Sequence, residues 1–453
     1  MIRFVDRDDE LSILNRAWDS DSSQFIVLYG RRRIGKTTLL DQFFKDKSGI
    51  FYISQDAYFR IQITELKNYI AEYLNDKFLR KTDIEDWSDL FDYLEKVLDS
   101  NKRFFIVLDE FTYLVKNDRS VLTKLQRFWD RFLSRTNIML VICGSDFGMI
   151  NDTVLSYSSP LYGRRTRDIL LGPLDLSNSL KFTAMPFEDA LMLYMTIGGI
   201  PEYLNRAQDY RDYFSFIMRE FGQKQGYFYR EPYFLLSQEF RNYNVYFSIL
   251  NAVSTGKNKP SEIANFIGFP TKNIYVYLEN LIRLGFLTKT TPLFDKKNNG
   301  HYDLSDRMMD FWFNYVYDHR ENIERNSETF GFDFSRYFGK RFESLVRDQV
   351  IGKLYPGSQI GSWWYRDTEI DIIAYTPKKN KAIICECKWK NDVSPLQIYS
   401  EMKKKEEVLL EYKNIEIAGY HIFAKSFKDF TQTDNIVIHD LPDIRNIVTG
   451  NIA

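Results

Sequence analysis

The stretch FIVLYGRRRIGKTTLLDQF, residues 25–43, decides how the first part of the chain folds. Its first five residues, Phe25 to Tyr29, are apolar or aromatic and predict a buried strand. Residues 30–37 then match the pattern G-x-x-x-x-G-K-[ST], and an apolar-periodic helix follows. A strand, a glycine loop and a helix in this order predict a loop that holds phosphate groups.

The chemistry of this loop gives its residues distinct roles. Gly30 and Gly35 let the backbone turn its N–H groups inward around an anion, and the helix N-terminus adds positive potential. Lys36 would reach the β- and γ-phosphates of a nucleotide, and Thr37 would hold Mg²⁺. We therefore predict that ATP binds at Gly30, Arg31, Arg32, Arg33, Ile34, Gly35, Lys36, Thr37 and Thr38.

Two later strands should complete the nucleotide site. The run FFIVLDEF, residues 104–111, ends in Asp109 and Glu110. Asp109 would bind the Mg²⁺ of the nucleotide, and Glu110 would orient the attacking water, so both are predicted catalytic residues. The run NIMLVICGSDF, residues 137–147, places Ser145 where a γ-phosphate sensor is expected. A plain strand-to-turn Gly-Ser is the alternative.

Arginines follow in SPLYGRRTRDILLGPL, residues 159–174. Arg164, brought near the phosphates in cis or from a neighbouring subunit, could stabilise charge in the transition state. Solvated charge or helix capping is the alternative. Because the strands recur with helical segments between them, we expect a parallel sheet wrapped by helices.

Composition limits the remaining possibilities. The chain has 453 residues, of which 44% are hydrophobic and 27% charged, and this length suggests about three domains. A net charge of −1 means that any basic surface must be local. Three cysteines without a C-x-x-C pair, and four histidines, make a zinc site improbable. The charged N-terminus and the lack of a long apolar run predict a cytoplasmic protein without a membrane span.

The middle of the chain predicts a winged helix-turn-helix. Three short amphipathic helices are expected over about 246–256, 260–268 and from 270 onward, followed by two strands around an Asn-Asn-Gly turn. The third helix and the wing would offer DNA the residues Lys272, Asn273, Tyr275, Lys296 and Lys297. An interaction or hinge module is the alternative. The aromatic segment 306–319 predicts a helix whose rings pack in a core rather than stack on bases.

A β-hairpin near the C-terminus gathers a second set of polar residues. Strands are predicted over 369–375 and 381–389, and a loop at Pro377–Asn380 sets Asp371 opposite Glu386. Lys388 lies two residues after Glu386 and points to the same face. The opposite face carries Ile370, Ile372, Cys385 and Cys387, which suit a core.

Two carboxylates beside a lysine are the parts that metal-assisted phosphodiester hydrolysis needs. The acids can bind one or two Mg²⁺ ions, with Mn²⁺ as an alternative, and the lysine can act on a bound water or on a scissile phosphate. A salt bridge from Lys388 to both acids is the rival interpretation. Eight lysines against three acids in residues 376–405 would form a basic skirt for a phosphate backbone, unless Lys403–Lys405 are a solvated helix face.

The motifs of the first half resemble the archaeal-type ATPase family, a branch of the STAND/AAA+-like P-loop proteins. They are YGRRRIGKTTLL, FFIVLDEF, ICGSDFGMI, SPLYGRRT and GGIPEYL (198–204), within residues 1–235. The resemblance implies a sensor strand between the two Walker strands and a helical lid that contains GGIPEYL near the nucleotide. From the residues alone, GGIPEYL is a helix stop and restart.

The C-terminal residues Glu343, Asp371 and Glu386-Cys387-Lys388 resemble the PD-(D/E)XK nuclease fold. The segment from 338 to about 440 is similar to the DUF234 domain fused after such ATPases, although Ile370 stands where the name-giving proline would be. The resemblance implies that Asp371 and Glu386 bind metal, that Lys388 supports the nucleophile, and that Glu343 assists from the first helix.

These observations predict an α/β chain with five parts. They are a P-loop NTPase core (1–172), a helical lid (173–238), a winged helix (239–305), a helical linker (306–335) and a small PD-(D/E)XK nuclease-like domain (336–453). The expected function is an ATPase whose nucleotide state gates a metal-dependent nuclease acting on nucleic acid, DNA more than RNA, with a homo-oligomer as one form of assembly. A STAND-type signalling or scaffold ATPase and a DNA-binding regulator are the alternatives.

Overall fold

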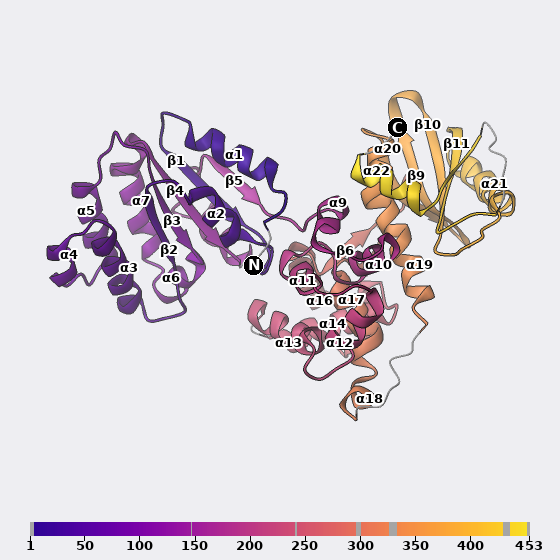
Figure 1. Ribbon diagram of the computed structural model, residues 1–453, viewed down its shortest axis with the longest axis horizontal. Coiled ribbons are helices and arrows are strands. Elements are labelled where there is room, and N and C mark those ends of the chain that lie inside the picture. Colours follow the sequence, from indigo (N-terminus) through magenta and orange to yellow (C-terminus); the bar gives the residue numbers. More distant parts are fainter. Residues whose placement is uncertain are drawn as a thin grey trace. The chain divides into compact units, whose positions relative to one another are not determined.

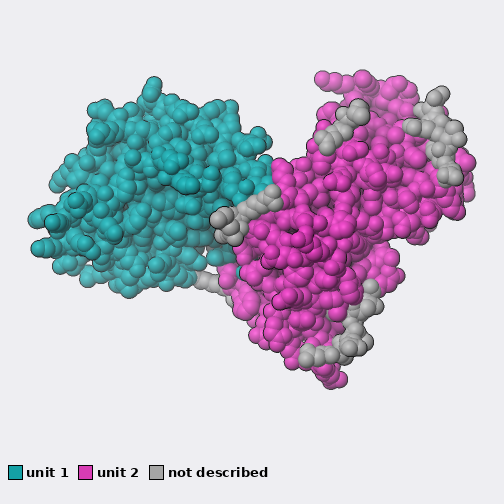
Figure 2. Space-filling view, viewed as in Figure 1, with its two compact units in different colours: residues 1–173 teal, residues 174–453 magenta. Residues whose placement is uncertain are grey.

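The computed structural model describes residues 4–145, 147–240, 242–295, 300–325, 333–428 and 435–450. The chain forms two compact units, Met1–Pro173 and Leu174–Ala453 (Figures 1 and 2). Of the helices in these described ranges, none is long and apolar enough to pass through a membrane.

The first unit is built on a sheet of five parallel strands in the order β2-β3-β4-β1-β5. The strand that precedes Ser145, β4, lies between β1 and β3, as the family resemblance implies. Four of the strands read as almost unbroken apolar runs because helices cover both faces of the sheet. The strands are β1 (Gln24–Tyr29), β2 (Gly49–Ile53), β3 (Phe104–Asp109), β4 (Ile138–Gly144) and β5 (Arg167–Leu170).

Helices lie on both sides of this sheet (Figure 1), and side chains of the strands pack against them. Phe105 of β3 meets Trp18 of α1 (Asp8–Trp18) and Phe44 of α2 (Lys36–Phe44). Ile106 and Leu108 belong to a core formed with α3 (Phe59–Tyr73), α5 (Trp87–Val97), α6 (Phe111–Asn117) and α7 (Val121–Arg131). The short elements are α4 (Lys77–Lys81), a 3₁₀ turn (Leu133–Arg135), α8 (Phe147–Ile150) and a π-helical turn (Asn151–Leu155).

The second unit begins with the helices of the predicted lid. They are α9 (Leu176–Ser179), a 3₁₀ turn (Leu180–Phe182), α10 (Phe187–Ile197), α11 (Pro201–Arg206), α12 (Tyr213–Glu220) and α13 (Tyr227–Glu239). Between α10 and α11, Gly198 has a φ of 68°, and a Cβ on Gly199 would lie 1.8 Å from the carbonyl oxygen of Leu174. With Pro201 opening α11, the predicted helix stop and restart is confirmed.

The predicted winged helix-turn-helix is present. It consists of α14 (Tyr243–Ser254), α15 (Pro260–Ile267), α16 (Thr271–Arg283) and the antiparallel strands β6 (Leu287–Thr290) and β7 (His301–Leu304). Lys272 and Asn273 are exposed, and Tyr275 is 47% exposed. Lys296 and Lys297 of the predicted wing lie outside the described residues.

The aromatic segment that follows is divided. It forms α17 (Arg307–Trp312) and a π-helical turn (Phe313–Tyr317), where a single helix was expected, and then α18 (Arg320–Glu324). Phe311, Trp312 and Phe313 are at most 2% exposed, which confirms that these rings pack in a core. The indole N–H of Trp312 donates to the carbonyl of Tyr229, so the one polar atom of this ring is satisfied.

The C-terminal part is a separate five-stranded mixed sheet in the order β12-β11-β10-β9-β8. The first three strands form an antiparallel meander, and α21 (Pro395–Tyr412) crosses over so that β11 runs parallel to β10. The strands are β8 (Gln359–Tyr365), β9 (Thr368–Thr376), β10 (Lys381–Lys388), β11 (Glu416–Ala424) and β12 (Ile436–His439). The other helices are α19 (Ser335–Leu345), which continues as a π-helical segment (Val346–Ile351), α20 (Gly352–Leu354) and α22 (Leu441–Thr449).

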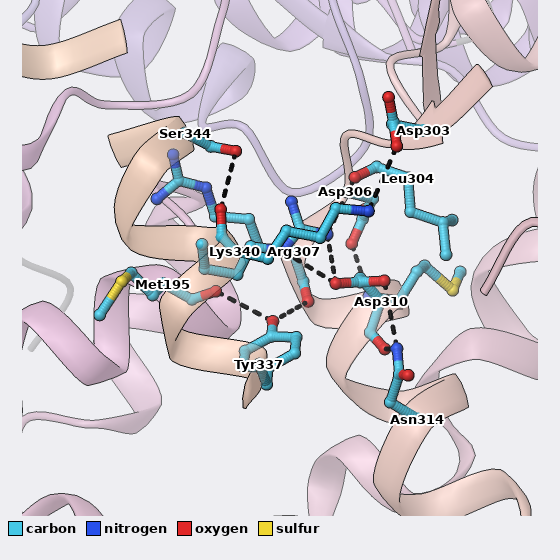
Figure 3. A network of polar contacts seen from close by, with 12 residues as sticks. Met195, Asp303, Leu304, Asp306, Arg307, Asp310, Asn314, Tyr337, Lys340 and Ser344 are labelled. Carbon is cyan, nitrogen blue, oxygen red and sulfur yellow. Dashed lines mark hydrogen bonds and ion pairs between the residues drawn. The ribbon is translucent and has the colours of Figure 1, made fainter. Parts of the chain in front are cut away.

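A buried ion pair joins α19 to the aromatic helix α17 (Figure 3). The Arg341 guanidinium donates to Asp310 Oδ2 at 2.8 Å and to the Leu304 carbonyl at 3.0 Å. Nearby, the Tyr337 hydroxyl donates to the carbonyl of Met195 in α10 at 3.1 Å. Burial alone would lower the pKa of Arg341, but Asp310 outweighs it and the pKa is raised. The guanidinium therefore stays charged inside the second unit.

Replacing Arg341 by Met should lower the free energy of unfolding of the second unit by about 3–5 kcal/mol, because the Asp310 carboxylate would stay buried without its partner. Urea titration of the full chain measures this loss. The neighbouring Lys340 reaches Asp303 with a side chain that is 69% exposed. Lys340→Met should therefore cost less than about 1 kcal/mol. Equal losses in the two variants would contradict the assignment.

Two buried histidines form a second polar feature of the C-terminal sheet. His421 on β11 and His439 on β12 share a hydrogen bond of 2.7 Å between Nδ1 and Nε2, and each is at most 8% exposed. Burial lowers the pKa of His421 to about 3, with a further decrease from His439. Burial also lowers the pKa of His439 to about 4, although Asp440 opposes the shift.

Acid should therefore weaken this sheet. Below pH 6.5 the unfolded chain binds protons at both imidazoles while the folded chain does not, so stability falls from pH 6.5 towards pH 4. At pH 5 the loss is about 2 kcal/mol for each histidine. Unfolding measured at pH 7 and pH 5 should show a smaller loss in the double variant His421→Gln/His439→Gln. The control His301→Gln, on β7, should lose as much stability between pH 7 and pH 5 as the wild type. An equally large loss in the double variant would contradict the prediction.

Candidate functional sites

The phosphate loop closes tightly between β1 and α2. A Cβ on Gly30 would lie 2.4 Å from the carbonyl oxygen of Leu171, and Gly35 has a φ of 92°, so each position favours glycine. The Lys36 ammonium lies inside the loop and donates to the carbonyls of Gly30 (2.9 Å) and Arg31 (3.1 Å). A phosphate would offer this ammonium stronger, charged acceptors in the same place.

Two of the predicted Mg²⁺ ligands already touch each other. The exposed Thr37 hydroxyl donates to Asp109 Oδ2 at 2.6 Å, and Asp109 Oδ1 accepts from the backbone N–H of Glu110 at 2.8 Å. Glu110 adopts a φ of 50°, which is rare for a non-glycine residue and marks this corner as a constrained site. Ser145 donates to Glu110 Oε2 at 2.9 Å. The structure thus brings the predicted loop, metal-binding, catalytic and sensor residues together.

The remaining loop residues frame this cluster. Arg33 has a φ of 70°, and Ile34 is 1% exposed. Arg32 donates to the hydroxyl of Tyr113 in α6 at 3.4 Å, whereas Thr38 is half-buried at the start of α2. The contact of Arg32 thus ties the loop to α6.

Arg164 is not brought to the phosphate loop. It makes a two-pronged ion pair with Asp130 at the end of α7, at 2.8 and 2.7 Å. Arg164 precedes β5, at the edge of the sheet where β1 begins, whereas the loop follows the end of β1. Because parallel strands put their two ends on opposite edges, a role in cis is not supported by this geometry.

Arg7 is a contact of the loop that the sequence analysis missed. It has a φ of 78°, is 6% exposed, and donates to the carbonyls of Ile34 (3.1 Å) and Gly172 (2.9 Å). Burial lowers the pKa of this guanidinium, partly offset by Glu10. Arg7 therefore ties the loop to the last residues of the unit.

The C-terminal hairpin has the predicted register. The paired residues run from Lys381 with Thr376 to Cys385 with Ile372, and the next pair in this register is Glu386 with Asp371. There Asp371 Oδ2 accepts from the backbone N–H of Cys387 at 2.9 Å. Ile370, Ile372, Cys385 and Cys387 are at most 3% exposed, as the alternation predicts.

Glu386 is the centre of the second site. It is only 2% exposed, and Lys388 Nζ donates to its Oε1 at 2.7 Å. Lys405, from α21, lies 2.9 Å from Oε1 and 2.8 Å from Oε2. Of the two interpretations of Lys405, the solvated helix face is wrong, because its ammonium pairs with the buried Glu386. Its part in a basic skirt stays a prediction. Lys403 contacts Glu406 and the hydroxyl of Tyr420.

Burial and neighbouring negative charges raise the pKa of the two other acids of this site, Glu343 and Asp371. Burial, then the charges of Asp371 and Glu369, raise the pKa of Glu343 to about 8. Burial and Glu386 raise the pKa of Asp371 to about 6, against the hydrogen bond from Cys387. Burial alone would lower the pKa of Lys388, but Glu386 and the other acids raise it. Glu343, Asp371 and Glu386 therefore interact electrostatically with one another and with the lysines at Glu386.

Asp371 and Glu386 offer part of a site for a divalent metal ion. Among the described residues, no group of three or more Asp, Glu, His or Cys side chains is arranged to hold a metal ion, so Glu343 does not complete a set with Asp371 and Glu386. Mg²⁺ is usually held by one or two carboxylates together with water and substrate phosphates. Asp371 and Glu386 supply that many, and their chemistry fits, although lysines now contact both oxygens of Glu386.

Comparisons with known proteins identify the class. A family model described as an ATPase domain predominantly from Archaea matches residues 4–207, and the DUF234 model, described as archaeal and bacterial proteins of unknown function, matches residues 312–408. The uncharacterized protein MJECL04 of Methanocaldococcus jannaschii is 32% identical over 443 residues, which cover 94% of this chain and 98% of that protein. The chain belongs to this family of archaeal ATPases with a C-terminal DUF234 segment.

Other similarities are shorter or structural. The uncharacterized ATP-binding protein MJ0423 of the same organism is 45% identical over 47 residues, 10% of this chain and 80% of that protein. The Walker-type ATPase paby2304 of Pyrococcus abyssi aligns with a TM-score of 0.51 and 20% identity, over 69% of this chain and 96% of that one. This likeness shows the fold, and the family supports binding and hydrolysis of ATP by the first unit.

Two substitutions should separate binding from hydrolysis. Lys36→Ala should weaken ATP binding and hydrolysis together, because it removes the only loop cation expected to meet the β- and γ-phosphates. Glu110→Gln should still bind ATP but hydrolyse it about 10²–10⁴-fold more slowly, as expected for loss of a general base. Phosphate release and titration with a fluorescent nucleotide measure the two effects. Lys45→Ala, just after α2, is the control, and parallel losses in binding for Lys36→Ala and Glu110→Gln would contradict these roles.

Proposed function

We propose that the second unit is a metal-dependent nuclease and that the nucleotide state of the first unit gates it. The observation that carries this proposal is the hairpin of β9 and β10, where Asp371, Glu386 and Lys388 meet at one half-buried point. A carboxylate is rarely placed in a core without a partner or a task. Membership of the family supports the ATPase activity, whereas cleavage of nucleic acid is proposed from the hairpin residues.

The chemistry divides among these residues. Asp371 and Glu386 would hold Mg²⁺ or Mn²⁺, which when bound lowers the pKa of its water and polarises the phosphate. Lys388 would stabilise negative charge that develops on the scissile phosphate or orient the attacking water. Glu343, with its raised pKa, is placed to hold or release a proton near this point. Nucleic acid, with DNA preferred, would be the substrate.

Contacts within the second unit support the gating. The predicted lid packs on the nuclease-like domain: the backbone N–H of Leu176 donates to Gln349 Oε1 at 3.0 Å. Glu188 of α10 pairs with Lys425, whose ammonium lies 5.3 Å from the ring of Trp389. Trp389 follows Lys388 directly in the chain. A movement of the lid would therefore shift residues next to the proposed catalytic Lys388.

A rival function keeps the ATPase and abandons cleavage. In a signalling or scaffold ATPase, the lysines at Glu386 would be purely structural, and ATP would drive assembly of a homo-oligomer. A regulator that binds DNA through the winged helix gains less support, because the exposed start of α16 combines Lys272 with Tyr275 and Val276, which are 47% and 62% exposed. The nuclease is favoured because its residues converge, while the described start of α16 exposes only one basic residue, Lys272.

A cleavage assay with defined variants tests the proposal. Single- and double-stranded DNA and RNA are incubated with the full chain, Mg²⁺ or Mn²⁺, and either ATP or no nucleotide. Asp371→Asn and Lys388→Met should each reduce cleavage at least about 10²-fold, and EDTA should abolish it. Lys36→Ala should remove the dependence on ATP but leave the hairpin intact.

Glu401→Gln is the matched control, because Glu401 is an exposed acid on α21. It should cleave like the wild type. Wild-type and Asp371→Asn proteins that are equally inactive on every substrate, together with ATP-dependent assembly seen by light scattering, would favour the scaffold instead.

A further inference from the structure

Two ammonium groups compete for one buried carboxylate at the second site. Lys388 donates to Oε1 of Glu386, at 2.7 Å, and no contact of Lys388 with Oε2 is seen. Lys405 contacts both oxygens, at 2.9 and 2.8 Å. A single negative charge needs only one of these cations for neutrality. The second ammonium is left to offset the charge of the neighbouring Asp371.

Lys405 takes the place that a divalent cation would need. A metal ion bound to Glu386 must approach one or both carboxylate oxygens, and the Lys405 ammonium lies within hydrogen-bond distance of each. A metal ion at Oε2 would overlap the position of the Lys405 ammonium, which lies 2.8 Å from this oxygen, whereas Lys388 contacts only Oε1 at 2.7 Å. A metal ion can therefore bind Glu386 only after the Lys405 ammonium has moved away, whereas Lys388 can stay at Oε1.

The side chain of Lys405 is able to make this movement. It is 25% exposed and reaches Glu386 by a flexible four-carbon stem, so that its ammonium can swing towards water without a change in α21. Glu386, at 3% side-chain exposure, has no such freedom. Asp371 also stays in place, because the backbone N–H of Cys387 holds it.

We propose that Lys405 is an internal counter-ion that occupies the metal position on Glu386 and is displaced when a divalent metal ion binds. This inference rests on the proposed metal site but not on cleavage. Lys405 sets how much free metal the site requires, and its displaced ammonium becomes available to a phosphate of the substrate. It is a positioning residue, whereas Lys388 stays with Glu386 in both states.

A purely structural role makes the opposite prediction. If Lys405 only neutralises Glu386, its removal leaves a buried charge less compensated, and the cost appears as lost stability with no gain in metal binding. If Lys405 competes with the metal, its removal lowers stability in the absence of metal and restores it when metal is added. Metal affinity therefore separates the two roles, whatever the catalytic outcome.

Binding of Mn²⁺ to the full chain without nucleotide is the direct test, with free Mn²⁺ measured by electron paramagnetic resonance. Lys405→Met should bind Mn²⁺ at least about tenfold more tightly than the wild type, since a charge-assisted contact no longer has to be broken. Thermal unfolding with and without Mn²⁺ should show a larger stabilisation by metal in the same variant. The double variant Asp371→Asn/Lys405→Met should lose the gain, which assigns it to this site.

Two matched variants control for charge and for folding. Lys404 is exposed one position earlier on α21, and Lys404→Met should match the wild type. Lys405→Arg keeps the cation and should also stay within about twofold of wild-type affinity. Equal or weaker Mn²⁺ binding by Lys405→Met, or an equal gain in Lys404→Met, would overturn the inference. Tighter metal binding without cleavage would leave the inference standing and the proposed nuclease refuted.

Discussion

A carboxylate removed from water must have its charge compensated, and this constraint organises each region of the chain that carries chemistry. Asp109 is fully buried and is held by the Thr37 hydroxyl and the Glu110 N–H. Asp310 is compensated by Arg341. Glu386 is compensated by Lys388 and Lys405. The same rule produces a nucleotide corner, a structural joint and a proposed metal site.

The three buried acids differ in whether an incoming cation can replace the groups of the protein that compensate them. Asp310 and Arg341 form a closed pair, 9% and 7% exposed, and removing one partner leaves the other buried without compensation. Thr37 is exposed and Glu386 is bound by side chains that reach water, so an incoming cation can take over their contacts. Buried acids with replaceable partners are candidates for function, and those with fixed partners are candidates for structure.

The sequence was most informative where spacing fixes geometry. A loop between two strands determines register, so the pairing of β9 with β10 could be worked out from the position of Pro377–Asn380 and was confirmed. The order of the first sheet, with β4 between β1 and β3, followed from the family resemblance. Helix starts and stops at Pro201 and Gly198 were equally local, because backbone geometry restricts those residues.

What the sequence did not reveal are contacts between residues far apart in the chain. Lys405 lies 19 positions from Glu386, and nothing in the run Lys403–Lys405 distinguishes the one that turns inward. Arg7 meets Gly172 across 165 positions. Arg164 was expected near phosphate because it follows a turn, yet its partner is Asp130, 34 positions earlier. Each outcome depends on which surfaces the packed helices present.

The proposed control of the hairpin site by nucleotide is limited by thermodynamics. A nucleotide can shift an equilibrium only by the difference between its affinities for the two states. Helix α10 belongs to the same compact unit as the hairpin, and its Glu188 pairs with Lys425 while its Met195 carbonyl accepts from Tyr337 of α19. Lys425 also lies over Trp389, beside Lys388. If, as proposed, the nucleotide state moves α10, the contacts of Glu188 with Lys425 and of Lys425 with Trp389 would carry that movement to the residue next to Lys388.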